Sequence, residues 1–574
     1  MNATPSRAVS GPAFAVLLGL VVLSLLAGLG MRDPSPPDEP RFVLAARDMV
    51  DSGQWLFPHR GSEFYAEKPP VFIWLQAMAY EVVGNWRIAF LLPSLLAALL
   101  ALWLVHDLGT RLWNRRIGRY AALALFVCLQ FGLQAKRGQI DMVLVAMTTL
   151  SLYGLLRHLL LGPDWRWAWL GLFAAGLGTV TKGVGFLPVL VLVPWAAWRW
   201  RTRAARVDAV PAAGNGWRWL VGGLCFVAGA GVWVLPMLWA VYHSADPAFH
   251  AYANEILFKQ TGKRYAGAWH HVQPFWYYAQ VMATLWLPGA LLVPWLLPAW
   301  WRRLRRMDPR FWLLLGWSAL VLLFFSASPG KREVYVFPML PALCLAAAPL
   351  LLGLLWRRGV QYVLLGYLLA LSLAMAAMAA SGLSGASEWA HRLAAQRDIG
   401  EATLRAFLWW MLGFGVAALA VAGWARRRRI GIAVVVVTAM LWFTYGVGLA
   451  PTLDADSSAR KLMQRVGQRI GPRAQLGMVA WREQNLLQSD RETIDFGFKR
   501  SWREQWLAAG PWLQADPQHR WIFVLDEALS ACVDRRAVVE IGESNRNDWL
   551  LVPGSAWRPG CTTPEFAAEE SESP

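Results

Sequence analysis

Two short polar stretches near the N-terminus place carboxylates beside basic side chains in an otherwise apolar chain. The first contains Asp38 and Glu39, with Arg41 close behind. The second contains Glu67 and Lys68, followed by two prolines. A carboxylate can activate or orient an acceptor group, while Lys and Arg can hold a phosphate that leaves. Such residues suit a reaction on a phosphate-bearing lipid, if the fold gathers them at one side of a bilayer.

Further polar residues stand at the ends of apolar runs along the chain. Asp141 begins one run, and Lys182 lies in a glycine-rich break between two others. Lys331 and Tyr335 lie in a short polar turn farther along. Because charge-assisted contacts between Lys and phosphate are strong, these positions are candidates for the same cavity.

Each of these stretches also has an ordinary structural interpretation. Asp38 and Glu39 would cap a helix and favour its dipole. Lys68 would extend toward lipid headgroups from an interfacial helix. Arg264 and His271 precede an aromatic stretch typical of an interfacial belt. Composition and spacing therefore leave glycosyl transfer, lipid binding and transport open.

The elements that must position these residues are membrane-spanning helices. The 574-residue chain is 56% hydrophobic and only 16% charged. Apolar runs of about 20 residues, the length that crosses a bilayer core, recur along most of it. They predict an all-α polytopic domain of about 13 helices over residues 1–449. The expected spans lie near 12–30, 87–105, 120–135, 142–160, 167–181, 183–198, 217–241, 275–299, 311–328, 335–355, 360–381, 405–425 and 430–449.

The net charge of +18 follows from this topology. Arginines cluster between the apolar runs, as is typical of cytoplasmic loops. With the N-terminus inside, the predicted spans place every cluster inside and the polar stretches described above outside. Nucleic acid is therefore not expected as a partner, although a basic chain often binds it. The clusters lie at 111–119, 199–206, 302–310, 357–358 and 426–429.

Residues 450–574 change character and predict a small α/β domain on the outer side. Leu462, Val466 and Ile470 fall on one face of a predicted helix. The stretches 520–529 and 537–543 are typical of buried strands. The chain ends in an acidic tail after about Pro564, whose composition predicts disorder.

The five cysteines are scattered and lack the spacing of metal ligands. Cys128, Cys225 and Cys344 fall within apolar runs and are expected to be core residues. Cys532 and Cys561 both lie in the predicted outer domain, where an oxidising compartment would allow them to pair. Spacing alone does not decide whether they do.

Six motifs follow one another between residues 31 and 345: PDEPRF, YAEKPPVFIWLQ, GQIDMVL, TKGVGFLP, HVQPFWYY and SPGKREVYVFPMLPAL. In this order they resemble the GT-C membrane glycosyltransferases. The nearest branch is ArnT-like, the undecaprenyl-phosphate aminoarabinose:lipid A transferases, with the protein mannosyltransferases as relatives. The predicted topology, with a first outer loop at 31–85 and an outer C-terminal domain, is similar to that branch.

The resemblance implies roles for individual residues. Asp38 takes the place of an essential first-loop aspartate, and Asp141 corresponds to a second acidic residue that lines the cavity. Lys68 and Arg41 resemble the groups that hold the phosphate of the lipid carrier. Further candidates for phosphate binding are Arg264 and Lys331, and further candidates for the cavity are Glu39, Lys182 and Tyr335.

The resemblance also implies a possible divalent metal, since Glu67 and His271 match positions that can hold zinc in the family. One carboxylate and one imidazole are too few for a closed zinc site, so water or other ligands would have to complete it. His270 is adjacent and is an alternative to His271. No cofactor is otherwise expected, and no nucleotide-binding loop occurs in the sequence.

The implied activity is transfer of a sugar from a polyprenyl-phosphate donor to lipid A or another envelope acceptor. It would take place on the periplasmic side of the bacterial inner membrane, among membrane lipids. Transfer to protein, as in O-mannosylation, is an alternative within the enzymes. A lipid or solute transporter is an alternative from another class, and it would place ionisable residues at mid-membrane depth. The sugar, the acceptor and the oligomeric state stay open.

Overall fold

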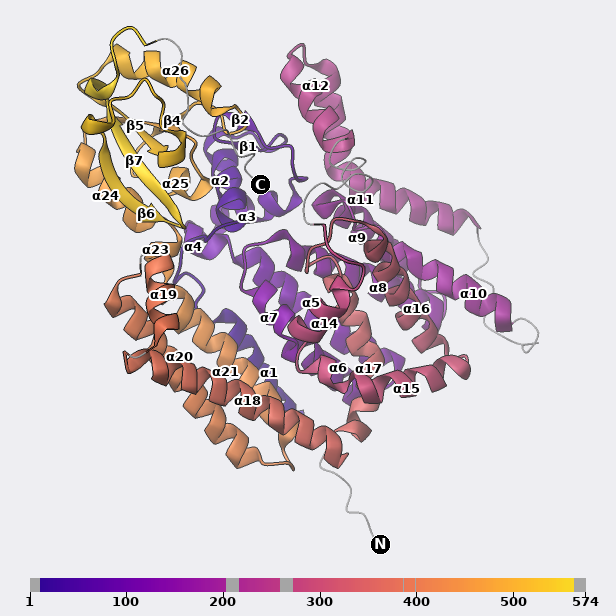
Figure 1. Ribbon diagram of the computed structural model, residues 1–574. Helices are drawn as coiled ribbons and strands as arrows, with labels where there is room; N and C mark the ends of the chain where they lie inside the picture. The colour runs from indigo at the N-terminus through magenta and orange to yellow at the C-terminus, as the bar shows by residue number, and fades with distance from the viewer. Residues whose placement is uncertain (1–10, 203–215, 259–271, 386, 398, 562–574) are drawn as a thin grey trace.

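The computed structural model describes residues 11–202, 216–258, 272–385, 387–397 and 399–561. A large helical domain forms most of the molecule, and a small domain built on a β-sheet packs at one end of it (Figure 1). This arrangement confirms the predicted fold class. The acidic tail after Pro564, for which disorder is predicted, lies outside the described residues.

The helical domain has the length and composition of a multi-pass membrane domain. Among the described residues, eight helices are long and apolar enough to cross a membrane, or ten if each of two bent helix pairs is one span. The predicted number of thirteen is not confirmed, because α1 (Gly11–Leu26), α9 (Trp165–Lys182) and α10 (Leu192–Thr202) are not among them. The eight are Trp86–Leu112, Ile140–Leu161, Gly216–His243, Pro309–Ala327, Phe337–Leu354, Arg358–Leu383, Glu401–Ala425 and Ile430–Thr452.

The two bent pairs show how apolar segments depart from straight spans. Helix α6 (Arg115–Val127) turns by 73° into α7 (Leu129–Ala135). The pair of α14 (Tyr277–Leu285) with the segment Gly289–Arg305 bends by 105°. Helix α7 therefore ends directly before the polar stretch 136–141, which leads into α8 (Ile140–Leu161).

The first loop, residues 31–85, is largely structured. Helix α2 (Glu39–Ser52) begins with Pro40 in its first turn, where a missing N–H costs nothing, and ends at Gly53 in the left-handed conformation. A short antiparallel hairpin follows, with β1 (His59–Arg60) paired to β2 (Glu63–Phe64). Helix α3 (Val71–Val83) then begins directly after the two prolines.

Helix α2 contributes to two hydrophobic cores. Phe42, Ala45 and Met49 pack in the main core of the helical domain. Leu44 instead packs in the core of the C-terminal domain, together with Leu462 and residues of its sheet. The first loop therefore lies between the two domains and is fixed by both.

The C-terminal domain is a five-stranded sheet with strand order β4-β3-β5-β7-β6. Strands β4, β3 and β5 are parallel, while β7 and β6 are antiparallel. The predicted helix is α24 (Arg460–Ile470), in which Leu462 and Val466 are buried and Ile470 packs against the same core. The predicted strands are β5 (Arg520–Leu525) and β6 (Val539–Ser544). The remaining elements are β3 (Gln475–Val479), β4 (Thr493–Asp495), β7 (Asn547–Pro553), α25 (Glu483–Leu487) and α26 (Trp502–Ala515).

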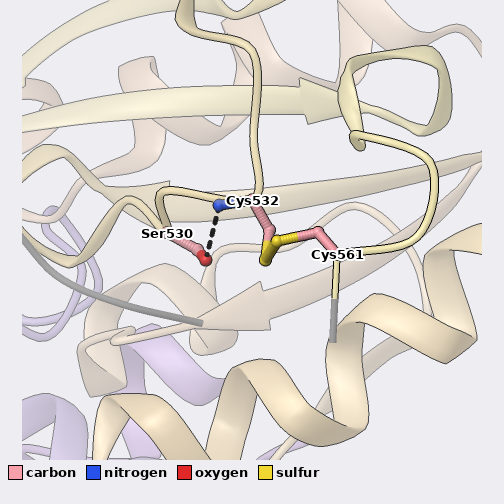
Figure 2. The surroundings of a disulfide bond; sticks show 3 residues. All are labelled: Ser530, Cys532 and Cys561. Carbon is pink, nitrogen blue, oxygen red and sulfur yellow. Dashed lines mark hydrogen bonds between the residues drawn. A yellow bond between two sulfur atoms is a disulfide. The ribbon is translucent and has the colours of Figure 1, made fainter. Parts of the chain in front are cut away.

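Cys532 and Cys561 form a disulfide in this domain, with Cα atoms 5.5 Å apart (Figure 2). The Cys532 N–H donates a hydrogen bond to the Ser530 hydroxyl at 3.2 Å, which fixes the turn that presents the sulfur. The bond joins the C-terminal end of the described chain to the core, since Cys532 is fully buried. The structure therefore contains the pairing that the cysteine spacing left open.

Candidate active site

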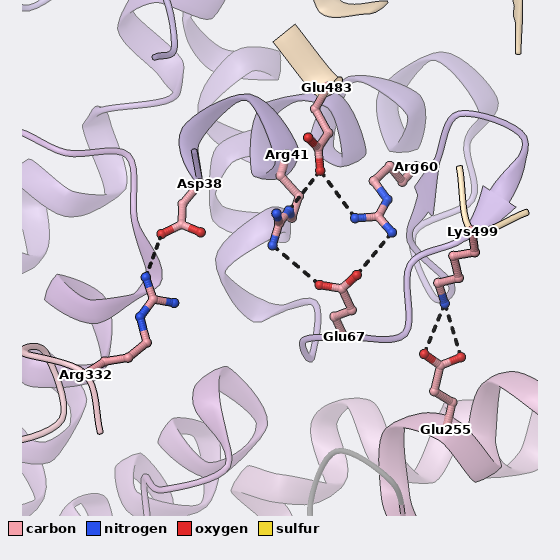
Figure 3. Close-up of polar contacts among 8 residues, drawn as sticks. All are labelled: Asp38, Arg41, Arg60, Glu67, Glu255, Arg332, Glu483 and Lys499. Carbon is pink, nitrogen blue, oxygen red and sulfur yellow. Dashed lines mark hydrogen bonds and ion pairs between the residues drawn. The ribbon is translucent and has the colours of Figure 1, made fainter. Parts of the chain in front are cut away.

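The Asp38 carboxylate lies where the first loop meets two polar turns of the helical domain. It accepts a hydrogen bond from the Gln139 side-chain amide at 3.1 Å. It also lies 3.5 Å from the Arg332 guanidinium, as Figure 3 shows. Three segments far apart in the sequence therefore meet at one carboxylate.

Asp38 stands at the cap position of α2 but makes no side-chain hydrogen bond to the helix. The ordinary interpretation, in which this side chain caps the helix, is therefore wrong. Its carboxylate faces Gln139 and Arg332 instead. Because the Asp38 carboxylate does not cap the helix, it is available to contact a substrate.

The neighbouring Glu39 explains why Asp38 is held in this place. Glu39 is buried, and its carboxylate accepts hydrogen bonds from Arg32 at 2.5 and 2.7 Å. The same carboxylate accepts the Gly138 N–H at 2.9 Å. Buried carboxylates need such complete partners, so the start of α2 is fixed against the turn that carries Gln139. Glu39, a predicted cavity residue, acts as an internal anchor in this structure.

Asp141 and Lys182 form an ion pair at the ends of neighbouring helices. Asp141 begins α8 and Lys182 ends α9. The Lys182 ammonium also lies 5.3 Å from the centre of the Tyr335 ring, a favourable cation–π geometry. Three of the predicted site residues are therefore brought together.

Arg332 interacts with residues of both groups, through a direct contact with Asp38 and electrostatically with Asp141. Burial alone would lower the pKa of its guanidinium, but the carboxylates of Asp38, Glu333 and Asp141 outweigh burial and raise that pKa. The guanidinium is therefore within electrostatic reach of both predicted acids. About a third of the Arg332 side chain is exposed, so the group is accessible.

Arg41 and Glu67 belong to a second cluster, the four-residue ring (Figure 3). This ring consists of Arg41, Arg60, Glu67 and Glu483. Glu67 contacts Arg60 at 3.1 Å and Arg41 at 3.4 Å. Glu483, from the C-terminal domain, contacts Arg41 at 3.0 Å and Arg60 at 3.3 Å. Each arginine therefore bridges two carboxylates, and the four formal charges cancel.

Lys68 and Tyr65 both interact with Glu67 of the four-residue ring. Burial would raise the pKa of Glu67, but Arg60, Arg41 and the adjacent Lys68 lower it. Tyr65 is fully buried, and its hydroxyl has no hydrogen-bond partner in the described part of the chain. Burial raises the pKa of Tyr65, and the carboxylates of Glu67 and Asp38 raise it further, while Arg41 and Arg60 lower it.

Three predicted residues are placed differently or lie elsewhere. The Lys331 ammonium donates to the carbonyls of Ser328 at 2.7 Å and Gln273 at 3.0 Å, so it binds loop backbone in this structure. Its predicted role in phosphate binding stays a prediction. Arg264 and His271 lie outside the described residues, as does His270.

The metal site that the family resemblance implies stays a prediction, because His271 lies outside the described residues. Glu67 contacts two guanidinium groups, which would repel a cation. Within the described ranges no group of three His, Cys, Asp or Glu side chains could hold a metal ion. No step of a reaction is therefore derived through a metal.

Sequence reasoning missed four residues that complete these clusters: Gln139, Arg332, Arg60 and Glu483. Gln139 lies two residues before the candidate Asp141, and Arg332 directly follows the candidate Lys331. Arg60 lies in the first loop without a motif that singles it out, and Glu483 is brought to Arg41 and Arg60 only by the docking of the C-terminal domain.

Comparison with known proteins supports the sequence motifs. The family model of dolichyl-phosphate-mannose-protein mannosyltransferases matches residues 67–214. Undecaprenyl phosphate-alpha-4-amino-4-deoxy-L-arabinose arabinosyl transferases from Pseudomonas aeruginosa and Pseudomonas fluorescens are 33% and 30% identical. Each alignment covers 60% of this chain, and it covers 60% and 58% of the respective relative. The chain thus matches about three fifths of the length of these relatives.

The fold is that of a solved relative over nearly the whole chain. The crystal structure of ArnT from Cupriavidus metallidurans bound to undecaprenyl phosphate matches with a TM-score of 0.73 and 20% identity. The match covers 96% of this chain and all of that one. The apo structure of the same protein matches with a TM-score of 0.69. The chain therefore has the fold of the ArnT structures, and the order of its motifs resembles that of the ArnT-like GT-C membrane glycosyltransferases.

Proposed function

We propose that this protein transfers a sugar from a polyprenyl-phosphate carrier to an acceptor in the bacterial envelope. The observation that carries the proposal is the contact of the Arg332 guanidinium with Asp38, beside the electrostatic influence on Arg332 of Asp141, which is paired with Lys182. Each carboxylate there has a basic partner: Asp38 contacts Arg332, and Asp141 contacts Lys182. Asp38, Asp141 and Lys182 lie at helix ends, where the headgroup of the proposed lipid substrate would reach them.

The chemistry needs a carboxylate near the acceptor and cations near the leaving phosphate. An acceptor oxygen attacks the anomeric carbon of the sugar, and the bond from that carbon to the phosphate oxygen breaks. The bonding electrons leave with the phosphate, so a cation stabilises the charge that develops on it. Arg332, Lys68 and Lys182 are the side chains proposed to supply that cation.

Asp38 has one of two roles, according to the acceptor. If the acceptor is a hydroxyl group, Asp38 takes its proton as a general base. If the acceptor is a phosphate, its oxygen is already ionised near neutral pH, and Asp38 orients it or balances charge. The hydrogen bond from Gln139 fixes the carboxylate in either case.

The donor is proposed to be a sugar on undecaprenyl phosphate, and the acceptor lipid A. The arabinosyl transferases of Pseudomonas carry the undecaprenyl phosphate sugar in their names, and the related crystal structure contains undecaprenyl phosphate. The motif resemblance described above supports lipid A as the acceptor. Aminoarabinose is therefore the first sugar to test.

A protein acceptor is the second candidate. It is favoured by the match of residues 67–214 to the family model of protein mannosyltransferases. That segment includes Glu67, Lys68, Asp141 and Lys182, so the two candidate functions share one site. They differ only in the acceptor.

The site is proposed to face the periplasm, with the protein in the inner membrane. Arginine clusters at 302–310 and 426–429 lie at helix ends away from the candidate site in the predicted topology. The C-terminal domain, which contains the disulfide, would then lie in the oxidising compartment.

The decisive experiment measures sugar transfer by the Asp38→Asn variant in membranes. Transfer should fall by roughly 100- to 10,000-fold, because the carboxylate is lost while its shape and hydrogen bonds remain. Asp51→Asn, on the exposed side of the same helix, is the matched control and should retain activity. Mass spectrometry of lipid A and of envelope proteins identifies the acceptor. Retained transfer by Asp38→Asn at normal protein level would reject the site.

A further inference from the structure

We propose that Glu483 of the C-terminal domain is a positioning residue for this active site. The inference rests on the proposed function and deepens it, since it assigns the domain a part in holding the cations and carboxylates of the first loop. Glu483 itself stands apart from Asp38, and it acts through the four-residue ring (Figure 3).

The geometry of the ring gives Glu483 its importance. Glu483 is only 5% exposed, and one of its carboxylate oxygens contacts both Arg41 and Arg60. Other nitrogens of the same two guanidinium groups contact Glu67. Because the arginines are shared in this way, neither has a carboxylate of its own.

Loss of the Glu483 charge would leave two guanidinium groups with one carboxylate. The Arg60 side chain is only 4% exposed and stacks over the Phe498 ring at 3.8 Å, so it cannot move into water. A buried charge without a full partner is costly. The ring would therefore rearrange, and Arg41 and Glu67 would move with it.

The ring connects directly to the residues proposed to do the chemistry. Arg41 lies one helical turn after Asp38 on α2, and Glu67 directly precedes Lys68. Glu483 thus holds both the helix that presents Asp38 and the segment that presents Lys68. A displacement of about 1 Å in such groups is enough to slow catalysis strongly.

Other contacts hold the C-terminal domain in place without Glu483. Asp495 accepts hydrogen bonds from Ser62 at 2.8 and 2.9 Å, and Glu63 accepts one from the Lys499 N–H at 2.9 Å. The Lys499 side chain reaches Glu255 of the helical domain at 3.0 Å (Figure 3). Removal of the Glu483 charge should therefore disturb the ring locally and leave the domain docked.

The test is a double-mutant cycle in the full-length protein, in proteoliposomes with an undecaprenyl-phosphate-linked aminoarabinose donor and lipid A. Glu483→Gln should lower kcat/KM roughly 10- to 100-fold. Arg60→Gln together with Glu483→Gln should recover much of this loss, because the remaining Arg41–Glu67 pair is again neutral. A purely steric role for Glu483 would give no such rescue.

Two controls distinguish an effect through the four-residue ring from a weakened domain interface and from a failure of the proposed function. Asp495→Asn weakens the interface outside the ring and should retain activity. Hydrogen exchange of residues 59–68 needs no substrate, and it should rise in Glu483→Gln and return toward normal in the double variant. Unchanged exchange and unchanged kinetics in Glu483→Gln would overturn the inference. If the wild-type protein transfers no sugar, the proposed function fails, and the exchange experiment still decides whether Glu483 positions the loop.

Discussion

The carboxylate of Asp38 lies 3.5 Å from the guanidinium of Arg332, although 294 residues separate them in the chain. This pair joins the start of α2 to the turn between α16 (Pro309–Ala327) and α17 (Leu340–Leu354). Ions paired at a partly exposed site hold each other loosely enough to exchange partners. In the proposed reaction, the phosphate of the donor would take Arg332 and release Asp38 toward the acceptor.

Replacement of Arg332 tests this exchange. Arg332→Gln should lower kcat/KM for the lipid-linked donor about 10- to 100-fold, because a charge-assisted contact to the leaving phosphate is lost. Arg332→Lys keeps the charge without the fork of donors and should lie between the wild type and Arg332→Gln. Steady-state kinetics in proteoliposomes measure both variants.

The matched control for Arg332 is Arg536→Gln, an exposed arginine of the C-terminal domain. It changes the net charge by the same amount and should leave kcat/KM unchanged. Equal losses in both variants would show that Arg332 acts only through overall charge. Full activity of Arg332→Gln would remove it from the site.

Replacement of Asp141 or Lys182 alone should destabilise the protein, whereas replacement of both should restore most of the lost stability. Asp141→Asn or Lys182→Met alone leaves a largely buried charge without its partner, at a cost of about 3–5 kcal/mol. The double variant leaves neither charge and should recover most of the folded protein. Fluorescence-detected size-exclusion chromatography after heating measures the fraction that stays folded.

Activity separates a structural role of this pair from a role in the site. If Asp141 and Lys182 line the cavity as proposed, the double variant should be folded yet poorly active. A double variant that recovers both folding and transfer would show that the pair is structural only. Poor folding of the double variant would show that the charges are not each other's main partners.

Local sequence patterns predicted most of the fold. The apolar runs located the helices, and the spacing of Leu462, Val466 and Ile470 located α24, because burial of one face leaves a period in the sequence. The number of spans was less predictable. Length and apolar composition do not reveal a bend, such as the 73° turn between α6 and α7, that depends on packing.

The site was predictable only in part, for a physical reason. Asp38, Asp141 and Lys182 lie in motifs at helix ends, where a charge is conspicuous against apolar neighbours. The sequence could not show which side chain of the turn at 331–332 faces Asp38: the motif points to Lys331, but Lys331 binds loop backbone and Arg332 makes the contact. Glu483 lies 442 residues from Arg41, and no local pattern encodes a contact between domains.

Loss of the disulfide should destabilise the C-terminal domain. Cys532 and Cys561 are 29 residues apart, and a cross-link over such a loop contributes about 3 kcal/mol. Replacement of both cysteines by serine should lower the urea concentration at which Trp506 and Trp549, both fully buried in this domain, become exposed. Pulse proteolysis of the full-length protein in urea, followed through the fragment 454–561, measures this change.

The helical domain supplies the control for the disulfide. Cys225→Ser removes a free, partly buried thiol and should leave the stability of the C-terminal domain unchanged. Treatment of the wild type with a reductant should reproduce the double serine variant and should have no effect on that variant. Equal resistance of all forms to proteolysis would contradict a stabilising disulfide.

Asp48 lies on α2 near the hairpin and the C-terminal domain, and its titration makes the stability of the fold depend on pH. Burial raises the pKa of Asp48 from 3.8 to about 7, with smaller contributions from Asp51 and Asp495, although the Gly61 N–H and Arg47 oppose the rise. The folded protein therefore holds this proton up to about pH 7, while the unfolded chain releases it near pH 4. Stability from this group is full below pH 4 and declines as pH rises to about 7.

Asp48→Asn removes this titration and keeps an oxygen that can accept the Gly61 N–H. The variant should gain on the wild type as pH rises from 4 to 7, by on the order of 1 kcal/mol because the site is partly solvated, and the difference should stay constant above pH 7. Thermal melts in detergent at pH 5, 6, 7 and 8 measure the gain. Asp51→Asn, whose side chain is 65% exposed, should show no such trend. A difference between Asp48→Asn and the wild type that does not change with pH would show that the pKa of Asp48 is not raised in the folded protein.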